Sequence, residues 1–198
     1  MSMNILIYDC EIANPIDDGK IQRLPDLVYA DGWGDYKGMG ISVVGCYSYS
    51  DNGGSYISFT KDNLKELQDA FDRHALLVGF NNVYFDNKLL EAHGFKIPRE
   101  KVYDMFLEIK RAANAGKFAK GYNLGNVAVK NGLQGKSGSG ENAPLMWQRG
   151  LHSEVIEYCL QDVKVTKEVL DLVISGSLLC PVTGQPLDVY KPVVKRGE

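Results

Sequence analysis

The chain has 198 residues, with 22 Lys and Arg against 25 Asp and Glu, 44% hydrophobic residues and a formal net charge of −3. This is the composition of a globular domain, and a chain of this length forms a core without disulfides or a structural metal. Its apolar runs are far shorter than the roughly 20 residues that span a bilayer. Its four cysteines are widely separated, as is typical of free thiols in a reducing cytosol. We therefore expect a cytoplasmic protein and exclude the membrane-spanning and secreted classes.

The first half of the chain is expected to open as a meander of strands. Apolar runs bounded by turn residues indicate strands, and apolar residues three or four apart indicate helices. The expected elements are strands at 4–10, 41–50 and 55–60, a helix at 61–74, a strand at 75–80 and a helix at 82–93. The sequence Asp-Asn-Gly-Gly at 51–54 is a hairpin signal. The run at 75–80 is apolar throughout, as in a central strand that is covered on both faces.

The second half adds one short strand and several helices, so the domain is α/β or α+β with a mixed sheet. The expected elements are a strand at 102–104, helices at 105–114 and 123–131, and a long helix from the N-cap Ser153 to about residue 176. Segments rich in Gly, Ser and Asn at 115–122 and 133–144 are expected to be mobile. We expect one domain over residues 1–176 and an irregular tail at 177–198.

Charge is unevenly distributed along the chain. Residues 1–95 hold 7 basic and 14 acidic residues, residues 96–149 hold 10 and 4, and residues 150–198 hold 5 and 7. The stretch 109–140 has no acid, and its basic and interleaved aromatic residues are Lys110, Arg111, Lys117, Phe118, Lys120, Tyr122, Lys130 and Lys136. Such a block either lines a track for single-stranded nucleic acid, through residues such as Lys117, Lys120 and Tyr122, or is a solvated surface.

Two acids, Asp9 and Glu11, stand at the end of the first expected strand. Alternate residues of a strand share a face, so both carboxylates leave the same side of the sheet. The pattern D-x-E also occurs at ordinary polar strand ends. Here the preceding run at 4–8, Asn-Ile-Leu-Ile-Tyr, is strongly apolar. An apolar strand that ends in two acids on one face favours a bound divalent cation.

A third acid, Asp86, ends the sequence Gly-Phe-Asn-Asn-Val-Tyr-Phe-Asp at 79–86. Here the central strand turns into a helix, and the helix dipole favours an acid in the first turn. Helix capping and a role in chemistry are therefore both open for Asp86.

The last helix carries Tyr158 and Asp162, which are four residues apart and stack on one face. That face is otherwise apolar, with Val155, Cys159 and Val169. An acid on a buried stripe is costly unless it meets a cation or a donor, whereas a tyrosine there is commonly part of the core.

Together these segments supply four carboxylates, from Asp9, Glu11, Asp86 and Asp162. Hard cations prefer oxygen ligands, so the set is able to bind two Mg²⁺ or Mn²⁺. Two such ions stabilise both the attacking water and the leaving oxygen of a phosphodiester.

The ordered motifs resemble those of the DEDDy group of 3′ to 5′ exonucleases, in the ribonuclease H-like (DnaQ-like) superfamily. They are D-x-E at Asp9 and Glu11, N-x-x-x-F-D at Asn81, Phe85 and Asp86, and Y-x-x-x-D at Tyr158 and Asp162. The middle motif is most similar to that of family B DNA polymerase proofreading domains. The resemblance implies a mixed five-stranded sheet in the order 3-2-1-4-5, with strand 2 antiparallel and with flanking helices.

The same resemblance implies roles for the motif residues. The four acids would hold two Mg²⁺ or Mn²⁺, Tyr158 would orient the attacking water, and Asn81 and Phe85 would lie against the terminal nucleotides. The substrate would be a 3′ end of single-stranded DNA or RNA, and the products nucleoside monophosphates. Asp104 resembles an aspartate that often follows the second motif, and a helix N-cap is an equal alternative for it.

Two other functions are compatible with the same motifs. One is a non-catalytic module that binds nucleic acid or a protein, which the presence of all four acids and Tyr158 disfavours. The other is a ribonuclease H-like endonuclease, which Phe85 and Tyr158 disfavour because both match motif positions of exonucleases. The segment 13–40 is either a substrate-facing loop or an insertion. The chain is too short for a polymerase domain as well, so a role in replication or repair would require a protein partner.

Overall fold

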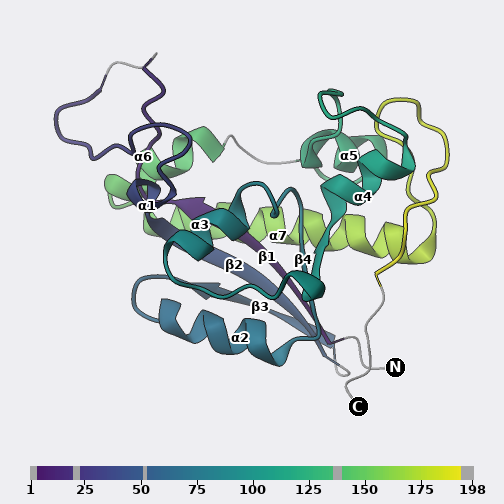
Figure 1. The fold of residues 1–198 in the computed structure, drawn as a ribbon, viewed down its shortest axis with the longest axis horizontal. Coiled ribbons are helices and arrows are strands. Elements are labelled where there is room, and N and C mark those ends of the chain that lie inside the picture. The colour runs from purple at the N-terminus through teal and green to yellow at the C-terminus, as the bar shows by residue number, and fades with distance from the viewer. Residues whose placement is uncertain (1–3, 20–22, 51–52, 136–139, 193–198) are drawn as a thin grey trace.

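The computed structural model describes residues 4–19, 23–50, 53–135 and 140–192. At its centre is a mixed five-stranded sheet (Figure 1). Its strands are β1 (Ile5–Ile12), β2 (Ile41–Ser50), β3 (Gly53–Phe59), β4 (Leu76–Gly79) and β5 (Val102–Asp104). The order is β3-β2-β1-β4-β5, with β2 antiparallel to β1 and β3, and with β4 parallel to β1 and β5. The expected sheet is therefore confirmed, while the turn at 51–52 lies outside the described residues.

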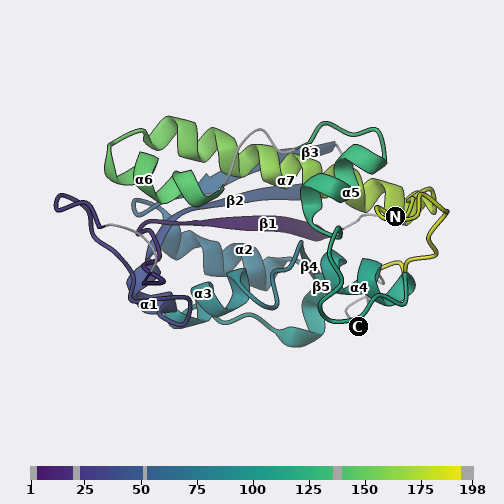
Figure 2. The same ribbon diagram turned by 90° about the horizontal axis from the view of Figure 1, so that it is seen from above.

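Helices cover both faces of the sheet, so the domain has three layers (Figure 2). They are α1 (Tyr36–Met39), α2 (Leu67–Arg73), α3 (Asp86–Ala92), α4 (Met105–Ala112), α5 (Leu124–Lys130), α6 (Ala143–Gln148) and α7 (His152–Ser175), with 3-10 turns at Leu64–Glu66, Arg99–Lys101 and Gly140–Asn142. α2 and α3 lie on one face, and α5, α6 and α7 lie on the other. Within the described ranges, no helix is long and apolar enough to cross a membrane.

The alternation of β1 decides which face receives the acids. Ile5 and Ile7 are fully buried against the α7 side, whereas Leu6 and Tyr8 are buried against α2 and α3. Odd positions of β1 therefore face α7, and Asp9 and Glu11 continue that row. The expectation that both acids share one face is confirmed. The alternating apolar residues of β1 fix this orientation, because they are buried in the hydrophobic clusters on the two faces of the sheet.

The turn between β4 and α3 departs from the expected helix at 82–93. The helix begins only at Asp86, because Asn81 has a φ of 69° and the chain makes a turn over 82–85 before it becomes helical. A positive φ is uncommon for a residue other than glycine, and asparagine is among those that tolerate it best. The later start places Asp86 in the first turn of α3.

Two other helix starts differ from the sequence expectation. The segment expected as a helix over 61–74 is a 3-10 turn followed by α2, because Asn63 ties back to the end of β3 by accepting the N–H of Thr60 at 2.8 Å. α7 begins at His152, so the expectation that Ser153 is its N-cap is wrong. The preceding Gly150 has a φ of 82°, and this turn leads directly into the helix.

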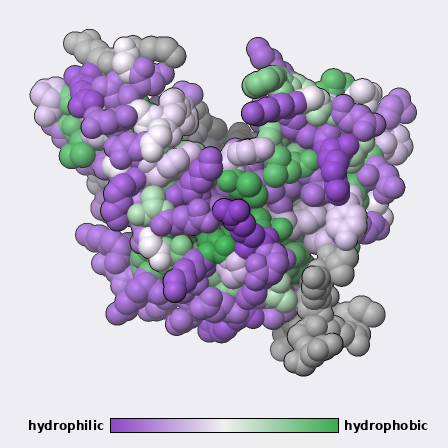
Figure 3. Space-filling view, viewed as in Figure 1, coloured by the Kyte–Doolittle hydropathy of each residue, from purple (hydrophilic) through white to green (hydrophobic). Residues whose placement is uncertain are grey.

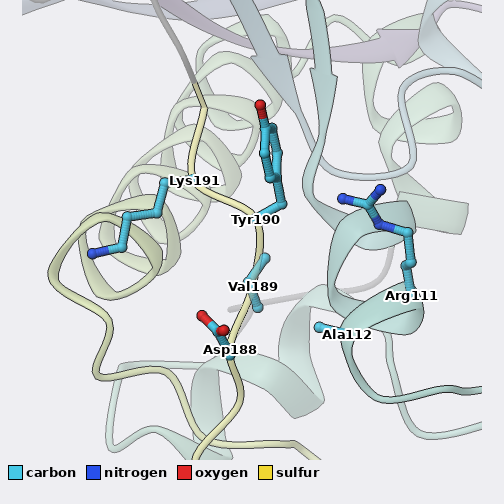
Figure 4. Close-up of a pocket in the computed structure, with 6 residues that line it drawn as sticks. All are labelled: Arg111, Ala112, Asp188, Val189, Tyr190 and Lys191. Atoms are coloured by element: carbon cyan, nitrogen blue, oxygen red, sulfur yellow. The ribbon is translucent and has the colours of Figure 1, made fainter.

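The described part of the tail, residues 177–192, forms an isolated bridge and turns rather than a helix or longer strand. It is nevertheless packed against the core through Leu178, Cys180 and Val189. Near its end, the Tyr103 hydroxyl donates to the Tyr190 carbonyl at 2.6 Å. Figure 4 shows a cavity of about 460 Å³ between this stretch and α4, where the Arg111 guanidinium lies 5.5 Å from the centre of the Tyr190 ring. The division into a domain and a tail stays a prediction.

Candidate active site

The end of β1 places Asp9 and Glu11 beneath α7. Glu11 is 7% exposed, and Asp9 is partly buried. Opposite Asp9 on β2 lies Gly45, where a Cβ atom would stand 2.9 Å from the Sγ of Cys159 and 3.2 Å from Val163. A side chain at position 45 would push α7 away from the sheet. The glycine therefore lets α7 approach the acids closely.

Cys159 is a site residue that the sequence reasoning missed. Its Sγ lies 3.4 Å from the Asp9 carbonyl oxygen and 3.8 Å from Asp9 Oδ2. One ligand atom from each of Asp9, Glu11 and Cys159 falls within 4.8 Å of the others. Burial, and then the charges of Asp9 and Glu11, raise the pKa of the thiol well above its usual value. Cys159 is therefore a neutral neighbour of the acids, and the available signal for it was its place beside Tyr158.

Tyr158 and Asp162 extend the acidic cluster along α7. Asp162 is 1% exposed, so the expectation of an acid on the buried stripe is confirmed. The pKa of Tyr158 is raised strongly by burial, and further by the charges of Asp162, Glu11 and Asp9 and by a hydrogen bond with Asp162. In the metal-free protein, this hydroxyl is thus a neutral group close to three carboxylates.

Asp86 approaches the cluster from the other side of β1. It is 6% exposed, and its Oδ1 accepts the N–H of Cys10 at 2.9 Å. The pairing of β4 with β1 reaches only as far as Val78 and Ile7, so beyond it the carboxylate takes the place of a strand partner. Burial raises the pKa of Asp86 to about 6. The acid is thus fixed to the backbone between Asp9 and Glu11.

Asp104 holds the turn that carries Asn81. Its carboxylate accepts the N–H groups of Phe106 and Leu107 in the first turn of α4, so it is the N-cap. It also accepts the N–H groups of Asn81 at 2.9 Å and of Val83 at 3.0 Å. One buried carboxylate therefore joins the start of α4 to the strained turn after β4. The N-cap, one of the two alternatives that the sequence left open, is thus observed, and the same carboxylate also contacts the second motif.

Two cavities flank the carboxylates. The Asp9-side cavity, of about 600 Å³, is lined by Asp9, Phe80, Asn81, Phe106, Asn123, Leu124 and Gly125. The Glu11-side cavity, of about 610 Å³, is lined by Cys10, Glu11, Ile12, Pro15, Ile16, Asp18, Leu24, Tyr29, Trp33, Phe85, Gly140, Glu141, Asn142, Pro144 and Leu145. One is bordered by the lobe of α4 and α5, the other by the lobe of α1 and α6. Figure 3 shows the surface hollowed between these two lobes.

The basic block differs from its sequence expectation in two places. Tyr122 is 7% exposed and packs in the core, with its hydroxyl 4.0 Å from Cys180 Sγ, so its expected exposure to a substrate is wrong. Lys110 is also buried, and its ammonium donates to the Lys117 carbonyl at 2.6 Å. Lys117, Lys120 and Phe118 are exposed, with Phe118 at 87%. Lys136 lies outside the described residues.

The acidic cluster suits divalent cations. Several carboxylates converge on the end of β1, and the rise in the pKa of Asp86 and of Tyr158 reflects buried negative charge that a cation would offset. The carboxylate ligand atoms are oxygens, which Mg²⁺ and Mn²⁺ prefer. The sulfur of Cys159 is a soft atom that suits these hard ions less well than an oxygen does. The residues present therefore fit the expected metal chemistry.

The five-stranded sheet and its acidic cluster form a ribonuclease H-like nuclease fold. The chain belongs to the RNase H superfamily, whose family model matches residues 30–174. Among solved structures it is similar to the family B DNA polymerase from the hyperthermophilic archaeon Pyrobaculum calidifontis, with 16% sequence identity and a TM-score of 0.52. The match covers 93% of this chain and 26% of the polymerase chain, so the chain spans about a quarter of that protein. No curated protein matches it.

Proposed function

We propose that this protein is a metal-dependent 3′ to 5′ exonuclease that releases nucleoside monophosphates from single-stranded or frayed nucleic acid. The observation that carries the proposal is the convergence of the motif residues on one site. Asp9 and Glu11 face α7, the Tyr158 hydroxyl interacts with them and with Asp162, and Asp86 binds the backbone between them. In the proposed function, the two acids of β1, the acid at the start of α3 and the acid inside α7 would act as one centre.

In this function Asp9, Glu11, Asp86 and Asp162 would hold two Mg²⁺ or Mn²⁺ ions. When bound, the ions activate water and stabilise the charge on the leaving 3′ oxygen. The chain's own contribution is to fix the ligands, because each acid is held by a strand or helix with buried neighbours. Burial holds the pKa of Tyr158 high in the metal-free protein, so its hydroxyl keeps a proton that it can donate in positioning the attacking water.

The two cavities and the basic lobe supply a path for the strand. The Asp9-side cavity carries Asn81 and Asn123 on its wall, and the exposed Lys117 and Lys120 shortly precede Asn123 in the sequence. Exposed lysines bind phosphates of the strand without regard to sequence. Phe85 lines the Glu11-side cavity. The site is therefore flanked by space for nucleotides on both sides of the phosphodiester that is cleaved.

The direct test is digestion of single strands labelled at the 5′ or at the 3′ end, in Mg²⁺ and in Mn²⁺. We expect a ladder of shortening 5′-labelled products and release of a labelled mononucleotide from the 3′ end. Cleavage at internal positions of the strand, or no cleavage with either metal, would contradict the proposal. Matched DNA, RNA and dinucleotide substrates in the same assay identify the preferred nucleic acid.

The specific alternative is a non-catalytic module or an endonuclease with this fold. The arrangement of all four acids around one strand end disfavours the first, since a binding surface has no need of buried carboxylates that cost free energy. A protein partner in replication or repair belongs to the same proposal.

A further inference from the structure

The segment 13–40 presents exposed aromatic and apolar side chains beside the acidic centre. Trp33 is 64% exposed and Leu24 is 41% exposed, and both line the Glu11-side cavity together with the half-buried Tyr29. Large apolar side chains that gather in a cavity next to a site of chemistry mark a place where a ligand is held. The segment is therefore more than a connection between β1 and β2.

Hydrogen bonds to α6 hold this segment in place. The Gln148 side chain accepts the N–H of Val28 at 2.9 Å and donates to the Val28 carbonyl at 2.8 Å. The same amide donates to the Ala13 carbonyl at 3.2 Å and to Asn14 Oδ1 at 3.0 Å. One side chain thus joins the start and the middle of the segment to α6, whose residues Pro144 and Leu145 line the cavity. A wall fixed in this way loses little conformational entropy when it binds a ligand.

Aromatic packing connects the segment to the second motif. The Tyr36 ring lies edge-on to the Phe85 ring, with centroids 6.2 Å apart, and its hydroxyl donates to the Tyr84 carbonyl at 3.4 Å. Phe85 and Glu11 both line the cavity. Trp33, Phe85 and Glu11 therefore border the same cavity, and Tyr36 packs behind Phe85.

The cavity also differs in charge from the other side of the site. Of the described residues that line it, none is Lys, Arg or His. This described lining instead carries the carboxylates of Glu11, Asp18 and Glu141, which repel a phosphate. The lobe next to the Asp9-side cavity, by contrast, exposes Lys117 and Lys120. A flat, uncharged group fits such a cavity better than a continuing sugar-phosphate backbone.

We propose that the Glu11-side cavity binds the terminal nucleobase of the strand and that Trp33 stacks on this base. The inference rests on the proposed function, which assigns the adjacent phosphodiester to the acids. A base at the end of a strand carries no further phosphate, so it suits a cavity whose described lining includes carboxylates and large apolar side chains. Stacking on an indole accepts any base, because every base has a π face.

Fluorescence tests the contact without any need for turnover. The chain has two tryptophans, Trp33 and Trp147, so Trp147→Phe leaves Trp33 as the reporter. We expect saturable quenching when this variant is titrated, without divalent metal, with nucleoside 5′-monophosphates and with a short single strand. The reciprocal Trp33→Phe variant, which reports only Trp147, should show little change. If fluorescence anisotropy shows that the strand binds while the fluorescence of Trp33 stays unaltered, the inference is wrong.

Kinetics with a modified strand end separate stacking from a structural role. We expect Trp33→Ala to raise KM about 5-fold to 150-fold with little change in kcat, whereas Trp33→Phe keeps most of the affinity. On a strand whose terminal residue is abasic, the wild type and Trp33→Ala should have the same KM. The inference would be overturned if Trp33→Ala raised KM equally on the normal and the abasic strand, or if it raised KM on neither.

Val28→Ala is the matched control. Val28 is 63% exposed, belongs to the same segment and does not line the cavity, and its bonds to Gln148 use only its backbone. We expect its KM to equal that of the wild type. If the wild type cleaves no strand, the proposed function fails, and the fluorescence titration still decides whether the cavity binds a base.

Discussion

The two sides of the site are built in different ways. On the Asp9 side, the cavity wall comes from the second motif and α5, and one buried carboxylate, that of Asp104, fixes the strained turn at Asn81. On the Glu11 side, the wall is a long loop that the side chain of Gln148 attaches to α6. The acids between them stand on β1, α3 and α7. In the proposed function, the metal-binding acids thus stand on helices and a strand, whereas the residues that would contact the substrate stand mainly on connecting segments.

The largest effect is expected where the acids meet. Asp9→Ala or Asp162→Ala should lower kcat about a thousandfold or more, since each removes an oxygen ligand of a divalent cation while leaving both cavities in place. Single-turnover cleavage and strand binding by anisotropy measure the two effects separately. Glu154→Ala, which removes an exposed acid from the first turn of the same helix, is the control. Unaltered turnover in either variant would refute the metal assignment.

Tyr158→Phe should have a smaller effect on turnover. The ring is retained while the hydroxyl beside Asp162 is lost, so we expect kcat to fall about 10-fold to 100-fold and KM to change little. Steady-state kinetics in Mn²⁺ measure it. A loss as large as that of Asp162→Ala would mean that the tyrosine does more than orient water.

Asp104→Asn tests the fixed turn on the Asp9 side. An asparagine has one neutral acceptor oxygen, and the NH2 group in place of the other oxygen cannot accept an N–H. The turn at Asn81 should therefore loosen and KM should rise about tenfold. If Asp104 acts through Asn81, the double variant with Asn81→Ala should be no worse than Asn81→Ala alone. A double-mutant cycle on KM measures this, and additive effects would show that Asp104 acts elsewhere.

Asp86→Asn separates stability from metal binding. Burial raises the folded-state pKa to about 6, above the ordinary value of 3.8, so the metal-free folded protein binds this proton more tightly than the unfolded chain does. Ionisation therefore costs stability as the pH rises from about 4 to about 6, and the full cost applies above 6. The variant keeps an Oδ1 acceptor for Cys10, so we expect it to be more stable than the wild type at pH 7, by about 1 to 3 kcal/mol, and about equal at pH 4.

Urea unfolding in the presence of a chelator measures that difference. Added Mn²⁺ should then stabilise the wild type and have much less effect on the variant, since binding to the folded state alone raises stability. An Asp86→Asn protein that is less stable than the wild type at pH 7 would contradict the account of Asp86 as a buried acid whose ionisation lowers the stability of the folded protein.

The smallest effect is expected at the basic lobe. Changing Lys117 and Lys120 together to Ala should weaken strand binding several-fold and reduce the slope of log affinity against log salt by about 1 to 2. Phe118→Ala on the same exposed stretch should leave that slope unchanged. If the slope is unaltered in the double variant, these lysines are only solvated surface.

Sequence patterns predicted the parts of the molecule that local physics decides. The apolar run before Asp9 specified β1 and the face of its acids, and the i, i+4 spacing placed Asp162 on the buried side of α7. The resemblance supplied the strand order, which local patterns leave open. These features depend on alternation and helical periodicity, which are visible within a few residues of sequence.

The remaining features depend on contacts between distant residues. Cys159 reaches Asp9 because Gly45, on another strand, leaves room for α7. Tyr122 is buried because the tail folds back and places Cys180 over it. The loop before β2 is held by Gln148, 120 residues after Val28. No local pattern reports such packing. The exposure of Tyr122 was therefore predicted wrongly, and the sequence did not decide whether the segment 13–40 is a substrate-facing loop or an insertion.

The central claim is that the acids cleave from a strand end. Digestion of a circular and a linear single strand of the same sequence, in Mn²⁺, tests it most directly. We expect the wild type to degrade the linear strand to mononucleotides and to leave the circle intact. The Asp9→Ala variant should cleave neither strand. Cleavage of the circle by the wild type, lost in Asp9→Ala, would show that the same acids act within a strand and would contradict the account.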